Sequence, residues 1–227
     1  NEFTAFGSAL HTLCEHAIVD NIQDDEYDEF FEHAFEKEIA RLLSGGAEFN
    51  QKLVDDMLEQ AKKLSPQIIP EVVKHFDDYE VFSVEEKIYE EIKDFDTDYK
   101  FKGFIDLVLK TSDGKYHIID WKTCSWGWDA KKRSERLVTY QLTLYKKFFC
   151  QKHNIDPSLV ETHFALLKRT AKKDNVEIFR VTSGPRKTSN ATDLLTRGIK
   201  SIQSGLKIKN RNSCTYCEFC NTSDCPR

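Results

Sequence analysis

Hydrophobic and polar residues follow two spacings along the chain, which separate a helical part from a part with strands. Apolar positions recur every three or four residues between 8 and 79, as in helices that bury one face. We predict a first helix over 8–20 with Ser8 as its N-cap, and two or three helices over 26–79 with a break at Ser44-Gly45-Gly46. The pattern therefore predicts an N-terminal helical lobe.

After position 79, β-branched and aromatic residues gather in short runs that are typical of strands. The predicted strands span 81–89, 99–110, 116–121, 161–169 and 176–181, with a long helix over 130–151 and a last helix over 188–204. This order predicts an α/β core over 80–206. With the helical lobe at 8–79 and a cysteine-rich tail at 207–227, we expect one domain of 227 residues.

A hairpin is predicted from Gly103 to Thr123, where two apolar runs flank an Asp-Gly turn. Its first arm contains Asp106, and its second contains Asp120 and Lys122. Strand side chains alternate between faces, so Asp120 and Lys122 point the same way. We expect the antiparallel arms to bring Asp106 alongside this pair.

Two carboxylates and an ammonium group on an apolar sheet are costly unless other groups compensate their charges. A divalent cation between the carboxylates does so, and it activates water and stabilises charge on a phosphate. Lys122 would then orient the nucleophile or neutralise phosphoryl oxygens. The alternative is an ordinary ion pair of Asp106 and Lys122 on a surface hairpin. Taken alone, the pattern favours this ion pair, because it is common by chance.

The motifs G-F-I-D at 103–106 and I-I-D-W-K-T at 118–123 resemble the core of the PD-(D/E)xK nuclease superfamily. They are most similar to its RecB-like exonuclease branch, which includes Cas4 proteins and the mitochondrial genome maintenance exonuclease. The segment F-G-S-A-L-H-T-L-C-E at 6–15 resembles the branch's histidine motif, and Gln141 and Tyr145 match its Q-x-x-x-Y helix. The resemblance implies a restriction-endonuclease-like fold and a Mg²⁺- or Mn²⁺-dependent DNA exonuclease acting on free or single-stranded ends.

The resemblance also implies roles for particular side chains. The metal ligands would be His11, Asp106, Asp120 and an acid of the first strand, for which Glu85 is preferred to Glu86. Lys122 and Gln141 would position the attacking water. Tyr145 would stack on a base or bond the DNA backbone, and helix–sheet packing explains this tyrosine equally well.

Charge is distributed unevenly along the chain, although its net value is only -5. Residues 1–100 contain 26 acids and 9 Lys or Arg, a balance of -17, whereas residues 101–227 contain 12 acids and 24 bases, a balance of +12. A basic half that contains the candidate site suits an enzyme acting on a polyanion. The candidate DNA contacts are Lys131, Lys132, Arg133, Arg136, Lys168 and Arg169, with Trp126 and Trp128 either stacking on bases or anchoring their loop.

Four of the seven cysteines, Cys214, Cys217, Cys220 and Cys225, lie in the tail, where their spacing suits an iron–sulfur cluster or zinc. The resemblance favours a [4Fe-4S] cluster over Zn²⁺, with three ligands at Cys214, Cys217 and Cys225. A segment upstream of the non-Met first residue, Cys220 or Cys14 would supply the fourth ligand. The remaining alternative is a packed tail without metal.

No apolar run is long enough to span a bilayer, so we expect a soluble intracellular protein without a membrane partner. The compact form suits a stand-alone phage or bacterial enzyme for replication, recombination or repair, with a helicase or similar protein as a possible partner. The alternative function is a non-catalytic nucleic-acid-binding or assembly module with a metal-stabilised tail.

Overall fold

The computed structural model describes residues 1–93, 95–206, 214 and 217–225, and its contacts divide them into two compact units. The first unit, Asn1–Ala191, contains the sheet and the helices packed on it. The second, Thr192–Arg227, contains most of the last helix and the described tail residues. The helical lobe and the core thus share one unit, and a single nuclease domain over the whole chain stays a prediction.

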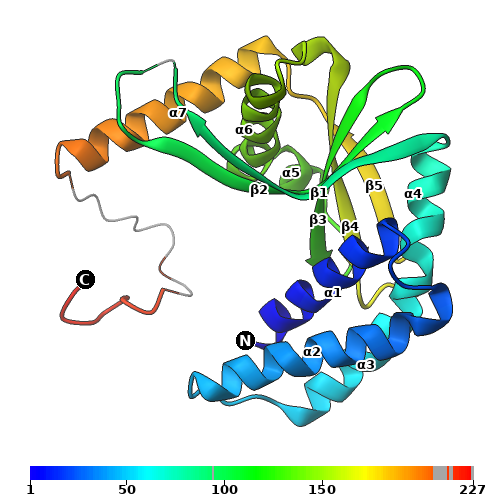
Figure 1. Cartoon of the computed structure of the whole chain (residues 1–227). Helices are drawn as coiled ribbons and strands as arrows, with labels where there is room; N and C mark the ends of the chain where they lie inside the picture. Colours follow the sequence, from blue (N-terminus) through cyan, green and yellow to red (C-terminus); the bar gives the residue numbers. More distant parts are fainter. Residues whose placement is uncertain (94, 207–213, 215–216, 226–227) are drawn as a thin grey trace. The chain divides into compact units, whose positions relative to one another are not determined.

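A mixed five-stranded sheet forms the centre of the first unit, with the strands in the order of the sequence (Figure 1). The strands are β1 (Tyr79–Glu91), β2 (Lys100–Thr111), β3 (Tyr116–Cys124), β4 (Val160–Lys168) and β5 (Val176–Val181). Only β3 and β4 pair in parallel, because a helical crossover joins them, and the other neighbours are antiparallel. The mixed central sheet that the sequence predicts is confirmed.

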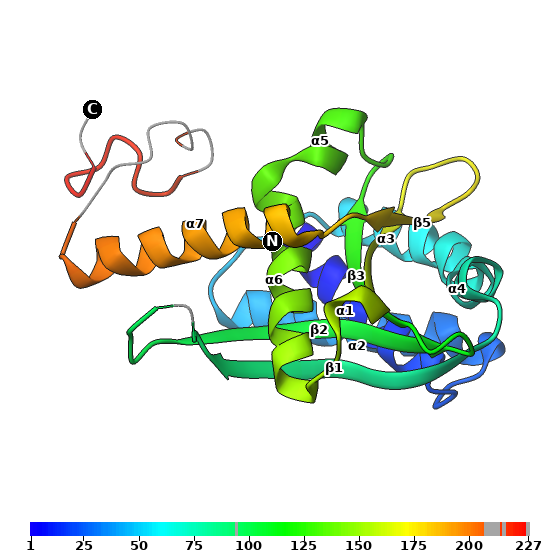
Figure 2. The same ribbon diagram turned by 90° about the horizontal axis from the view of Figure 1, so that it is seen from above.

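Helices cover both faces of this sheet (Figures 1 and 2). The lobe consists of α1 (Glu2–Ile18), α2 (Tyr27–Ser44), α3 (Gln51–Leu64) and α4 (Ile68–Phe76), with short 3₁₀ turns at Asp24–Glu26 and Ser65–Gln67. Its buried stripes include Phe6, Leu10, Leu13, Phe31, Phe35, Met57 and Leu64, and they pack against Leu107, Ile119, Trp121 and Leu167 of the sheet. Each fully buried large apolar side chain contributes about 2 kcal/mol of stability.

The first helix begins earlier than the sequence pattern predicts, so the prediction of Ser8 as its N-cap is wrong. Asn1 is the N-cap instead, and its side chain accepts the backbone N–H of Thr4 at 3.1 Å. Asn satisfies the free N–H groups at a helix start as well as Ser does. The added turns include Gly7, where a Cβ would lie 3.2 Å from Thr123 Oγ1 at the end of β3. Glycine thus brings α1 close to that strand.

The helix predicted over 130–151 is divided in two, α5 (Ala130–Ser134) and α6 (Arg136–His153), because Glu135 has an extended ψ of 124°. Contacts distant in the sequence hold α5 in place: the Arg133 guanidinium donates to the Trp128 carbonyl at 2.8 Å and to Glu177 of β5 at 2.6 Å. A local pattern does not reveal such contacts. A 3₁₀ turn at Pro157–Leu159 precedes β4, and α7 (Pro185–Gln203) is the last helix.

The hairpin formed by β2 and β3 closes as predicted. Gly114 has a φ of +80°, a conformation that glycine adopts readily, and its N–H donates to the Thr111 carbonyl at 2.9 Å. Among the described residues, no helix is both long enough and apolar enough to cross a membrane.

Candidate active site

The strands β2 and β3 separate at the two acids of the hairpin. Their ladder runs from the pair Lys110 and Tyr116 to the pair Leu107 and Ile119, which leaves Asp106 and Asp120 as the next position. From there β2 pairs only with β1, and β3 pairs only with β4. At this fork the Asp106 carboxylate accepts the backbone N–H of Trp121 at 2.7 Å. This hydrogen bond links β2 to β3 through the side chain of Asp106, a candidate catalytic residue.

Asp120 and Lys122 lie on the same face of β3 and form an ion pair, with Lys122 Nζ 2.5 Å from Asp120 Oδ2. The ammonium group also lies over the Phe164 ring, 5.9 Å from its centroid. Asp120 is only 1% exposed, and the Lys122 ammonium contacts its Oδ2 without meeting hydrogen-bond geometry. The ammonium therefore does not fully satisfy this buried carboxylate.

His11 and Glu85 complete the cluster from two further elements. His11 Nδ1 lies 3.6 Å from Asp106 Oδ2, and single ligand atoms of His11, Glu85 and Asp106 all lie within 4.8 Å of one another. The register of β1 and β2 sets Glu85 opposite Asp106, between the pairs formed by Val84 and Glu86. The fork therefore gathers an imidazole and two carboxylates beside Asp120.

Glu85 adopts a left-handed backbone conformation inside its strand, with a φ of +45°. This conformation is unfavourable for a residue other than glycine, by about 1 kcal/mol or more, and such strain is concentrated at functional sites. Glu86 serves a different purpose: its buried carboxylate binds Lys152 at 2.8 Å and His153 at 2.5 Å, and also contacts Ser83. Glu85 is thus the acid of β1 that is directed to the cluster.

Electrostatics also favour a cation at the fork. Burial raises the pKa of Asp106 to about 6, and burial together with the neighbouring Asp106 raises the pKa of Asp120 to about 6. Burial also raises the pKa of Glu85, with Glu15 and Asp120 adding to the shift. Burial lowers the pKa of His11, which keeps the imidazole neutral and able to ligate. Carboxylates that repel one another when ionised, beside a neutral imidazole, fit a bound divalent ion.

Gln141 and Tyr145 approach the cluster from α6. The Gln141 amide donates to the Tyr145 hydroxyl at 3.2 Å. Burial raises the pKa of Tyr145, and Asp120 and Asp106 add to the shift. Gly103 makes room for this ring, because a Cβ there would lie 2.6 Å from Tyr145 Cε1. The same contact means that Tyr145 packs against the sheet with its hydroxyl near the acids, and a contact with DNA stays a prediction.

A groove of about 710 Å³ borders the cluster on the side of α1. Its lining residues are Phe3, Thr4, Gly7, Ser8, His11, Thr12, Glu15, Glu38, Arg41, Glu85 and Thr123. Two of the candidate ligands, His11 and Glu85, line this groove. Reagents in solution can therefore reach the cluster.

A family model described as the PD-(D/E)XK nuclease superfamily matches residues 1–224. The chain belongs to this superfamily. Its fold agrees with a crystal structure from Eubacterium rectale named "Putative exonuclease", with a TM-score of 0.53 and 14% identity over 87% of this chain and 71% of that one. The crystal structure of SSO0001 also matches, with a TM-score of 0.43 and 16% identity over 96% of this chain and 82% of that one. A search of curated protein sequences gives no significant match.

The basic residues of this nuclease divide into exposed ones and ones with internal partners. Lys131, Lys132 and Arg136 are exposed at α5 and the start of α6. Arg133 pairs with Glu177 and stacks on Phe179, with 4.4 Å between its Cζ and the ring centroid. These contacts assign Arg133 a structural task besides any contact with nucleic acid.

The two basic residues at the end of β4 also have partners within the nuclease. Lys168 Nζ lies 3.3 Å from Glu177. Arg169 donates to Gln60 at 2.9 Å and to Ser125 at 3.2 Å, and it lies over the Phe3 ring. Arg169 thereby joins α3, α1 and the loop after β3, beside the groove.

The two tryptophans of the loop after β3 differ. Trp126 is 70% exposed, whereas Trp128 packs edge-on against Phe164 at 5.0 Å, with Lys132 over its ring. Trp128 therefore anchors the loop. Trp126 is the one with a free surface for stacking.

Sequence reasoning missed an exposed strip on β1 and β2, which we call the hairpin strip: Lys87, Tyr89, Lys100, Lys102 and Phe104. Lys87 pairs with Phe104 and Tyr89 with Lys102 across the strands, so these side chains share one face. Lysine ammonium groups lie 5.4 to 5.7 Å from the Tyr89 and Phe104 ring centroids. The alternation of Lys with aromatic residues from 99 to 104 was the available signal.

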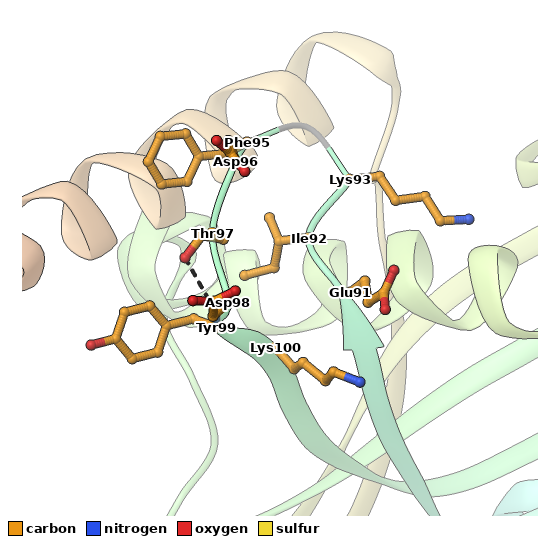
Figure 3. Close-up of a pocket in the computed structure, with 9 residues that line it drawn as sticks. All are labelled: Glu91, Ile92, Lys93, Phe95, Asp96, Thr97, Asp98, Tyr99 and Lys100. Carbon is orange, nitrogen blue, oxygen red and sulfur yellow. Dashed lines mark hydrogen bonds between the residues drawn. The ribbon is translucent and has the colours of Figure 1, made fainter.

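A separate pocket of about 560 Å³ lies at the loop that joins β1 to β2 (Figure 3). It is lined by residues between Glu91 and Lys100, and Tyr99 donates its N–H to Thr97 Oγ1 at 3.2 Å. None of the residues predicted for the nuclease site is among its described lining residues. We assign it no part in catalysis.

The cysteine tail lies in the second unit, and its residues 207–213, 215–216 and 226–227 lie outside the described part. Among the residues that are described, no group of three potential ligand atoms within 4.8 Å includes a tail cysteine. Cys14, the alternative fourth ligand, is 0% exposed within the lobe core. An iron–sulfur cluster or zinc at Cys214, Cys217, Cys220 and Cys225 stays a prediction.

Proposed function

We propose that the protein is a metal-dependent DNA exonuclease that hydrolyses phosphodiester bonds at free or single-stranded ends. The observation that carries the proposal is the fork of β2 and β3, where Asp106, Asp120 and Lys122 meet beside His11 and Glu85. A polyanionic substrate also agrees with the positive balance of residues 101–227. The superfamily supplies the reaction class, and the DNA substrate and exonuclease mode rest on the resemblance of the motifs.

The candidate ligands of Mg²⁺ or Mn²⁺ are His11, Glu85 and Asp106, which form one group, together with Asp120 of the neighbouring strand. The three carboxylates are donors of the kind that these ions prefer. When bound, the ion supplies Lewis-acid stabilisation and lowers the pKa of water. The Asp106 carboxylate is held by the Trp121 N–H, which orients it for ligation. The neutral imidazole of His11 presents a lone pair beside it.

Lys122 and Gln141 carry the remaining chemistry. The Lys122 ammonium, fixed by Asp120, is available to neutralise charge that develops on the phosphoryl oxygens. Gln141, fixed through Tyr145, orients the attacking water. These two groups approach from β3 and α6, so they act on a phosphate located at the opening of the sheet.

The substrate path that we propose joins exposed groups on both sides of the fork. Phe104 of the hairpin strip precedes Asp106 by two residues on β2, and Trp126 follows Lys122 in the next loop. Lysine ammonium groups bind phosphates and exposed rings stack on bases without reading sequence, which suits single-stranded DNA. Lys131, Lys132 and Arg136 extend the basic surface.

A digestion assay tests the proposal. End-labelled single-stranded and linear duplex DNA are incubated with Mg²⁺ or Mn²⁺, beside closed circular DNA and an EDTA control. We expect nucleotide release from the linear substrates only, with at least 10³-fold slower release for Asp120→Asn and Lys122→Ala. Lys110→Ala, which removes a partly exposed lysine that pairs with Glu80 on the same hairpin, is the matched control and should retain activity. Cleavage of closed circles would refute the exonuclease mode, and full activity of Asp120→Asn would refute the assigned site.

A further inference from the structure

A second cluster of ligand-type side chains lies on the opposite face of β3 from Asp120. His117 of β3 and Glu161 and His163 of β4 each offer one atom, and these atoms lie within 4.8 Å of one another. His117 pairs with Glu161 in the parallel ladder, and the two imidazole centroids are 5.3 Å apart. Phe76 of α4 packs against both rings. The cluster therefore lies between the sheet and the lobe.

Both histidines are buried with an unsatisfied nitrogen. His117 is 8% exposed and His163 is 2% exposed, and the Nδ1 atom of each has no hydrogen-bond partner among the described residues. The Thr111 hydroxyl contacts His117 Nε2 at 3.1 Å, which leaves Nδ1 as the open ring atom. Two adjacent buried nitrogens without partners are unusual in a folded protein and call for a ligand.

We propose that His117, Glu161 and His163 bind one divalent transition-metal ion of the Zn²⁺ or Co²⁺ type. Two imidazoles and one carboxylate are the donor set that such ions select, whereas Mg²⁺ prefers oxygen donors. Metal bonds of about 2.0 to 2.2 Å place ligand atoms up to about 4 Å apart, so atoms within 4.8 Å close on an ion with small rotations.

The surroundings agree with this assignment. Burial lowers the pKa of His163 to about 3, so its lone pair is available at neutral pH. Glu161 pairs with Arg180 at 3.3 Å and Lys115 at 3.8 Å, which are partly exposed contacts that a metal bond outcompetes. His75 of α4 lies 5.5 Å from His163, centroid to centroid, where an imidazole can approach as a fourth ligand. The bound ion would clamp α4 to β3 and β4.

This site differs from the nuclease cluster in its ligands, its metal preference and its role. None of its three residues lines the groove, and we expect metal binding there to raise the stability of the fold. Its existence does not depend on the proposed exonuclease function.

Metal binding by the whole chain tests the proposal after removal of metals with a chelator. We expect Co²⁺ to give visible absorption without thiolate charge-transfer bands from this site, and Zn²⁺ to raise the Tm. Glu161→Gln and His117→Ala should each lose one equivalent of Zn²⁺, or bind it at least tenfold more weakly. Asp120→Asn, which alters the nuclease cluster, and His33→Ala, which removes an exposed histidine, should keep that equivalent.

Glu161→Gln protects the test from a folding defect, because its side chain is nearly isosteric and lies at the edge of the cluster. Tail thiolates that bind Co²⁺ would be recognised by thiolate-to-metal charge-transfer bands, which a site of two imidazoles and one carboxylate does not produce. If both cluster variants bind as much Zn²⁺ as the wild type, the proposal is wrong.

Discussion

Gly103 and Tyr145 lie in direct contact across the sheet and α6: a Cβ built on Gly103 would be 2.6 Å from the ring atom Cε1. The strand residue is glycine because a ring occupies the place of its side chain. The same ring carries the hydroxyl that accepts from Gln141, so this contact sets how closely α6 delivers both side chains to the fork.

We therefore predict that Gly103→Ala pushes Tyr145 away, lowers the free energy of unfolding by about 1 to 3 kcal/mol and reduces nuclease activity. Tyr145→Leu alone should also destabilise, but Gly103→Ala combined with Tyr145→Leu should cost less than the two separate changes together. Urea unfolding of the four proteins measures this coupling. Strict additivity would contradict the contact.

Asp120 is expected to weaken the fold in the absence of metal. Its pKa in the folded state, about 6, lies above the ordinary value of 3.8, so the folded state disfavours the ionised form. We predict that Asp120→Asn has a higher free energy of unfolding than the wild type, by about 2 kcal/mol, when both are unfolded with urea at pH 7 in EDTA. Added Mg²⁺ should stabilise the wild type more than the variant. A less stable variant in EDTA would disprove this account.

The pH dependence of stability follows from the same two acids. Because the pKa values of Asp106 and Asp120 are raised, their stabilising contribution is complete below about pH 4 and is lost as the pH rises through about 6. The difference in unfolding free energy between Asp120→Asn and the wild type should therefore appear between pH 4 and 6 and stay constant above it. Denaturation in EDTA at several pH values measures it.

Metal binding at the fork should show the opposite trend with pH. Protons compete with the ion for carboxylates whose pKa is about 6, so we predict that Mg²⁺ binding weakens about tenfold between pH 7 and pH 5 for each of these acids that must ionise. Calorimetric titration should also detect proton release on binding. An affinity that is equal at both pH values would argue against Asp106 and Asp120 as ligands.

Substitution of Trp126 should affect DNA binding, whereas substitution of Trp128 should affect stability. Trp126→Ala removes an exposed ring, so we predict weaker binding of single-stranded DNA, by about 1 to 3 kcal/mol, at an unchanged Tm. Trp128→Ala removes a packed ring and should lower the Tm. Fluorescence anisotropy with a labelled oligonucleotide and thermal unfolding distinguish the two, and equal effects in both assays would contradict the assignment.

The hairpin strip should contribute to binding through charge. We predict that changing Lys87, Lys100 and Lys102 together to Ala weakens binding and reduces the slope of log affinity against log salt by about 2. A triple change of Lys52, Lys62 and Lys63 on α3 removes the same charge from another surface and is the matched control. An equal loss in both variants would show that only net charge matters.

Local patterns predicted the hairpin and its acids because strand alternation and an Asp-Gly turn fix their arrangement within one short segment. The division of the helix at Glu135 could not be predicted, since it depends on Arg133 reaching Glu177 of β5. The strain at Glu85 and the orphaned nitrogens of His117 and His163 also arise only when distant elements pack. For the same reason, the sequence could not show which basic residues have internal partners, because a partner such as Gln60 of Arg169 is remote in sequence.

The fork joins groups whose meeting depends on very different lengths of chain. Asp106 and Asp120 belong to one hairpin, so their approach needs only a local turn, whereas His11 arrives when the N-terminal lobe docks. A partly opened molecule with the lobe detached would retain the two carboxylates and lose the imidazole. If His11 ligates the metal as we propose, detachment of the lobe would abolish activity before the sheet unfolds.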